Sequence, residues 1–71
     1  MTAKEGIEYL KNKCPDNEPI FILRGRDKLA YHTVLLWGDL AEKEGVNESK
    51  VCDSIKCAFE LRKWNPRRLP D

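Results

Sequence analysis

The stretch LAEKEGVNESKV, residues 40–51, holds the end of one helix and the start of another. Gly45 suits the left-handed backbone conformation in which many helices end. Asn47 is a favoured N-cap for the helix that follows, and Val46 before it can pack on Val51 as a hydrophobic staple. Because so few residues separate the two helices, the stretch predicts a tight antiparallel helical hairpin.

The two arms of this hairpin can be placed from their apolar periodicity. The first begins near Asp27, which either caps the helix directly or precedes it in a short turn over residues 27–30. The second should run from about Glu48 to Trp64, because the residue before Pro66 disfavours the helical region. The faces expected to pack together are Ala30, Val34, Trp37, Leu40 and Ala41 in the first arm, and Val51, Cys52, Ile55, Ala58 and Phe59 in the second.

A further helix is predicted at the start of the chain, where Thr2 and Glu5 have the spacing of a capping box. It should end at the turn-rich loop 15–19. The apolar run after this loop is predicted to be a strand buried on both faces. A lone strand must pair either within the chain or with the same strand of a second copy, so the run is also a candidate for self-association. Its residues are Ile20, Phe21, Ile22 and Leu23.

Together these elements predict a mostly α fold of the small α+β kind: a helix, one short strand, then the antiparallel helical hairpin. At 71 residues the chain can form one domain with a thin core. We assign residues 1–65 to that domain and residues 66–71 to a flexible tail. The composition is apolar enough for folding, and the net charge of +1 gives no general attraction to nucleic acid or membrane.

Several classes of function are not expected from this sequence. No apolar run approaches the length of a membrane span and the first residues do not resemble a signal peptide, so we expect a cytoplasmic protein without a membrane partner. The three cysteines lack the paired spacing of zinc sites or disulfide frameworks, and His32 is the single histidine. The sequence also contains no glycine-rich phosphate-binding loop. We therefore expect neither an enzyme nor a metal or other cofactor.

The hairpin turn resembles the middle of a helix-turn-helix, a motif with which many proteins bind DNA. The resemblance lies in Ala41, in Gly45 and in Val51. The second helix would, however, present the carboxylates of Glu48 and Asp53 to a phosphate backbone, which repels them. A helix-turn-helix-like nucleic-acid-binding protein is therefore the alternative interpretation of the function.

The preferred interpretation rests on a second apolar face of the second arm. Cys57, Leu61 and Trp64 have the i, i+4, i+7 spacing of an interface anchor. Either the N-terminal helix covers this face in a three-helix core, or the face binds another protein. Two basic runs, 24–28 and 62–68, could orient such a partner through its acidic surface. The candidate partner-binding residues are Leu35, Leu61, Trp64, Arg24, Arg26, Arg62 and Arg68.

These observations describe a small non-catalytic protein–protein interaction module. Its expected partner is another protein or a second copy of itself, and homodimerisation through the predicted strand remains open. Nucleic acid is the second candidate partner, through the hairpin or through the basic runs.

The run Glu18-Pro19-Ile20-Phe21-Ile22-Leu23-Arg24, followed by Asp27 and the hairpin, resembles a set of short uncharacterised proteins of bacteria and phages. The similarity extends from Glu18 to about Trp64. It implies the strand-then-hairpin architecture and a bacterial or viral source. It implies no activity.

Overall fold

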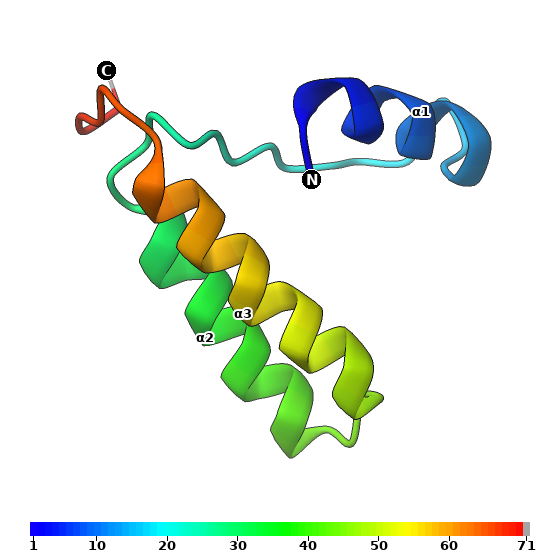
Figure 1. Cartoon of the computed structure of the whole chain (residues 1–71). Coiled ribbons are helices and arrows are strands. Elements are labelled where there is room, and N and C mark those ends of the chain that lie inside the picture. Colours follow the sequence, from blue (N-terminus) through cyan, green and yellow to red (C-terminus); the bar gives the residue numbers. More distant parts are fainter. Residues whose placement is uncertain (71) are drawn as a thin grey trace.

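The computed structural model describes residues 1–70 and contains three helices within them (Figure 1): α1 over Ala3–Lys13, α2 over Ala30–Lys43 and α3 over Glu48–Lys63. α2 and α3 lie side by side and antiparallel, and α1 stands away from both of them. The expected mostly α fold with a helical hairpin is confirmed.

The turn between α2 and α3 has the predicted helix-ending chemistry. Gly45 adopts φ +78°, which a side chain would disfavour. The Val46 amide donates to the Ala41 carbonyl at 3.0 Å and the Gly45 amide to the Glu42 carbonyl at 3.1 Å, the two bonds of a Schellman motif. Asn47 then accepts a hydrogen bond from the Ser49 amide at 2.8 Å, so the predicted cap of α3 is confirmed.

Small side chains form the contact between α2 and α3. The buried residues are Ala30, Gly38, Ala41, Val51 and Ala58. A Cβ atom placed on Gly38 would lie 3.0 Å from the Ser54 hydroxyl oxygen, so the two backbones approach closely there. The Ser54 hydroxyl donates to the Val51 carbonyl at 2.7 Å and is thereby satisfied. None of the described large side chains is fully buried.

This close approach corrects part of the predicted packing faces. Because Gly38 and Ser54 carry the contact, the larger side chains expected beside them are displaced to the flanks of the hairpin. Four predicted core side chains are instead 40–54% exposed: Trp37, Leu40, Ile55 and Phe59. Cys52 is exposed as well.

The predicted strand does not form within the chain. None of the described backbone hydrogen bonds outside the helices involves residues 20–23. Phe21 is 85% exposed and its neighbours Ile20 and Ile22 are exposed too, so the expectation of a strand buried on both faces is wrong for the single chain. The physical reason is that none of residues 1–70 forms a second extended segment alongside to complete a ladder. Pairing with a second copy stays a prediction.

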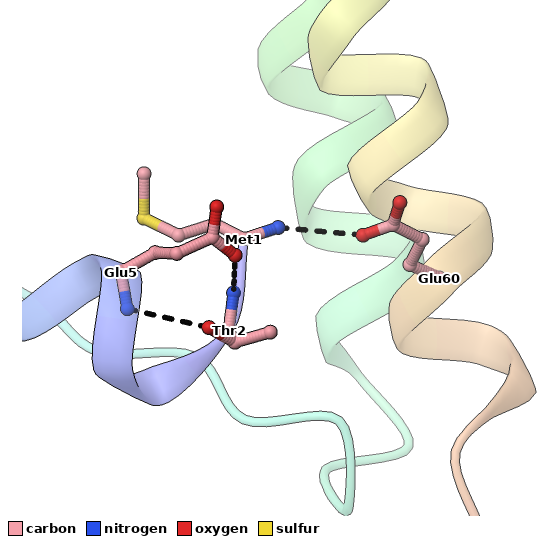
Figure 2. A network of polar contacts seen from close by, with 4 residues as sticks. All are labelled: Met1, Thr2, Glu5 and Glu60. Atoms are coloured by element: carbon pink, nitrogen blue, oxygen red, sulfur yellow. Dashed lines mark hydrogen bonds and ion pairs between the residues drawn. The ribbon is translucent and has the colours of Figure 1, made fainter.

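α1 begins at the predicted capping box, in which Thr2 and Glu5 exchange hydrogen bonds of 2.9 and 3.2 Å (Figure 2). It buries no residue and packs against neither α2 nor α3, so the three-helix core is not formed. Its described ion pair with the hairpin joins the Met1 ammonium to Glu60 at 3.3 Å. This hydrogen bond raises the pKa of the Met1 amino group, but both partners are exposed, and such pairs add little stability.

The solvent-accessible surface of the chain is larger than that of a compact monomer of the same mass. Its accessible surface is 6309 Å², whereas a folded monomer of 8.3 kDa exposes about 4,600 Å². Its radius of gyration is 12.9 Å, against about 11 Å for a compact domain of this length. About 1,700 Å² therefore remains uncovered relative to an ordinary small domain.

Substituting Gly38→Val should destabilise the hairpin, because the new side chain would meet Ser54 where the helices touch. We expect a loss of about 1–3 kcal/mol of unfolding free energy, measured by urea denaturation followed by circular dichroism. Gly6→Val is the matched control, since a Cβ atom there meets only the Met1 sulfur at 3.7 Å. Equal stability of the two variants would contradict the close contact.

Candidate functional site

The two basic runs of the sequence meet at one end of the hairpin, next to the start of α2 and the end of α3 (Figure 1). A parallel bridge pairs Asp27 with Arg68. The Arg68 amide donates to the Arg26 carbonyl at 2.8 Å, and the Lys28 amide donates to the Arg68 carbonyl at 3.0 Å. We name this region the basic end; its cations are Arg24, Arg26, Lys28, Arg62, Lys63, Arg67 and Arg68.

Asp27 shapes the chain on the α2 side of the basic end. Its carboxylate accepts a hydrogen bond from the Leu29 amide at 2.7 Å, and its carbonyl accepts one from the Ala30 amide at 3.1 Å. α2 therefore starts after a short turn, the second of the two predicted alternatives, and its N-cap residue Leu29 makes no side-chain cap. This turn places residues 26–28 against the C-terminal segment.

Aromatic and guanidinium groups form a hollow beside this turn. The Arg62 guanidinium carbon lies 5.1 Å from the centre of the Tyr31 ring, within the range of cation–π attraction. Arg67 donates from Nη2 to the Lys28 carbonyl at 3.3 Å, while its buried Nε has no hydrogen-bond partner. With His32, these four side chains line an open hollow of about 370 Å³.

Charge is distributed unevenly along the hairpin. Residues 24–28 and 62–68 contain seven of the 13 cations and one acid, Asp27. This gives the two segments a net charge of +6, so the rest of the chain carries −5 within the total of +1. A basic end on an otherwise acidic chain favours one orientation towards a negatively charged partner.

Trp64 adds an apolar group to the basic end. It caps the C-terminus of α3 and its side chain is 60% exposed. On one side the backbone of Gly25 passes so close that a Cβ atom there would lie 2.8 Å from the Trp64 Cβ. The indole is therefore anchored at its base by the turn and accessible at its surface.

The predicted partner residues divide into two groups. Arg24, Arg26, Arg62, Arg68 and Trp64 belong to the basic end. Leu35 and Leu61 are half-buried along the hairpin. Sequence reasoning did not anticipate that the basic runs meet, because residues 66–71 were expected to be a flexible tail. Arg68 in that tail is bonded to residues 26 and 28, and Asp71 lies outside the described residues.

Cysteine and histidine side chains do not gather into a chemical site. Cys14, Cys52 and Cys57 are free thiols. Among residues 1–70 no group of three metal-ligating side chains is close enough to hold an ion. Desolvation, followed by the Glu18 carboxylate, raises the pKa of the Cys14 thiol, the opposite of what a nucleophilic cysteine needs.

The described helices include none that is long and apolar enough to cross a membrane.

Gly25→Ala should loosen the basic end without unfolding the hairpin. The added methyl group would meet Trp64 and push the turn away, which weakens the hydrogen bonds at Lys28 and Arg68. We expect the exchange rates of these two amide hydrogens to rise about 10-fold, corresponding to ~1.4 kcal/mol of local stability. Arg24→Ala, at the exposed neighbouring position, is the control and should leave both rates within about 2-fold. Unchanged exchange in Gly25→Ala would refute the contact.

Comparisons with protein-family models, with curated proteins and with solved structures gave no match to this chain. The resemblance to short bacterial and phage proteins therefore stays a prediction.

Proposed function

We propose that this chain is a non-catalytic protein–protein interaction module whose basic end docks on an acidic surface of another protein. The observation that carries the proposal is the Asp27–Arg68 bridge, which joins two cationic segments around the exposed Trp64. An isolated basic run is usually just a solvated surface. Two runs held together around an indole have the composition of a binding interface.

The cations of the basic end are partly held in place before any partner arrives. Arg62 stacks on Tyr31, and Arg67 is bonded to the Lys28 carbonyl. Holding a guanidinium in position reduces the entropy lost when it pairs with a carboxylate. Arginine is also the cation best suited to bidentate pairing with carboxylates, and five of the seven cations are arginines.

Trp64 would supply the apolar part of the binding energy. Tryptophan and arginine are the side chains most often found to dominate interface energetics. The charges would set orientation and association rate, while burial of the indole would set the lifetime of the complex.

A nucleic acid is the alternative partner, and the basic end favours it more than the hairpin turn does. α2 and α3 run side by side, whereas the helices of a helix-turn-helix cross at roughly 90–120°. The carboxylates of Glu48 and Asp53 lie on α3 towards the other end of the hairpin. In this alternative the basic end would bind a single-stranded nucleic acid, with a base stacked on Trp64 and the phosphates neutralised by the arginines.

The test uses fluorescence anisotropy with two labelled probes, a 20-residue Glu/Asp-rich peptide containing leucine and a 20-nucleotide mixed-sequence single strand. We expect the full chain to bind the peptide. Trp64→Ala should weaken binding about 10-fold or more, while retaining its salt dependence, because it removes the apolar contact and no charge. Arg67→Gln/Arg68→Gln should also weaken it, more strongly at low salt than at high salt.

Lys11→Gln/Lys13→Gln on α1 is the matched control, since it removes the same charge away from the basic end. Equal weakening by both double variants would contradict a specific site. Preferential binding of the oligonucleotide, with an affinity that falls steeply as salt rises, would replace the proposal with its alternative. Failure to bind either probe at low salt would reject both.

A further inference from the structure

α2 carries a second apolar stripe, which faces away from α3. Three of its leucines are each about half exposed: Leu29 at the N-cap 50%, Leu36 58% and Leu40 54%. Together with Thr33 they follow one line along the helix, whereas Trp37 lies at the edge of the side that contacts α3. We name Leu29, Thr33, Leu36 and Leu40 the outer stripe.

Nothing within the described chain covers the outer stripe. α2 contacts α3 through its small residues Ala30, Gly38 and Ala41. At 100° per residue, Leu36 lies about 120° or more around the helix from each of these three residues, so the centre of the stripe is turned away from α3. α1 packs against neither helix of the hairpin. The outer stripe is therefore an amphipathic helix face without a partner.

The chain has enough uncovered surface for a dimer interface. The chain exposes about 1,700 Å² more than a compact domain of its mass. A standard protein–protein interface buries about 800 Å² on each partner, and obligate dimers bury more. Part of this excess belongs to α1 and to residues 20–22, and the remainder leaves room for an interface on the outer stripe.

The spacing of the outer stripe is self-complementary. Residues 29, 33, 36 and 40 are separated by intervals of four, three and four, which read the same in both directions. An antiparallel two-fold contact between two copies would therefore place Leu29 against Leu40 and Thr33 against Leu36, each twice. The Thr33 hydroxyl already donates to the Leu29 carbonyl at 2.8 Å, so its burial leaves no unsatisfied donor.

We propose that the partner of the outer stripe is a second copy of this chain, with the two α2 helices packed antiparallel and the hairpins forming a four-helix arrangement. This interface is distinct from residues 20–23, the segment that the sequence suggested for self-association. It does not depend on the function of the basic end. The antiparallel pairing places the two basic ends at opposite ends of the α2 pair, so both stay accessible.

The solution mass of the full chain by sedimentation equilibrium tests the dimer. We expect twice the chain mass of 8.3 kDa at micromolar concentration. Leu36→Glu should raise the dissociation constant at least about 100-fold, because each dimer contains the change twice at its centre. Circular dichroism should show the helices retained, since Leu36 faces away from α3. Phe21→Glu is the matched control at an 85% exposed residue and should leave the mass unchanged.

The pairing direction has its own test. Leu29→Lys and Leu40→Glu should each weaken the dimer alone, and an equimolar mixture should restore it, because only an antiparallel contact brings the lysine of one copy to the glutamate of the other. A monomeric wild-type chain, or a dimer disrupted by Phe21→Glu, would overturn the inference. A wild-type dimer without rescue in the mixture would overturn the antiparallel α2 contact.

Discussion

The close approach of α2 and α3 at Gly38 and Ser54 determines where every larger side chain of the hairpin can lie. Two helices that touch through glycine, alanine and serine have their axes close together, and no gap remains between them for an indole or a phenyl ring. Trp37 and Phe59 therefore lie beside the contact, 51% and 43% exposed. The hairpin gains close backbone packing, but it loses the burial of large apolar groups that usually stabilises a small domain.

This displacement explains which parts of the fold could be predicted from sequence. Gly45 and Asn47 each have one dominant local role, so the turn and the α3 cap were predictable from single residues. The packing faces were predictable in part: Ala30, Ala41, Val51 and Ala58 are buried as expected. Gly38 was missed and the larger side chains were misplaced, because apolar periodicity ranks large side chains first and does not count a glycine as a contact residue. The periodicity located the helices correctly and misplaced the contact line between them by part of a turn.

The candidate site was predictable in composition and not in arrangement. The arginines and Trp64 stand out in the sequence because charge and aromatic content are local properties. Their convergence depends on the backbone pairing of Arg68 with residues 26 and 28, and nothing in the local sequence indicates a bridge between segments about 40 residues apart. The run Ile20 to Leu23 has a strong local signal for a strand, but the strand does not form in the single chain. Its β-favouring side chains cannot form a strand without a neighbouring one.

The bridge between Asp27 and Arg68 has a mechanical consequence for the hairpin. Isolated helical hairpins fray from their open end, where the first turn of one helix and the last turn of the other have no covalent link. Here the Schellman turn closes one end and the bridge closes the other, so that the segments flanking α2 and α3 are joined to each other. Separating these flanking segments requires breaking the two backbone hydrogen bonds that join Arg68 to residues 26 and 28. The two helices should consequently melt as one cooperative unit, while α1, which the described contacts join to the hairpin through the exposed Met1–Glu60 ion pair, unfolds independently of them.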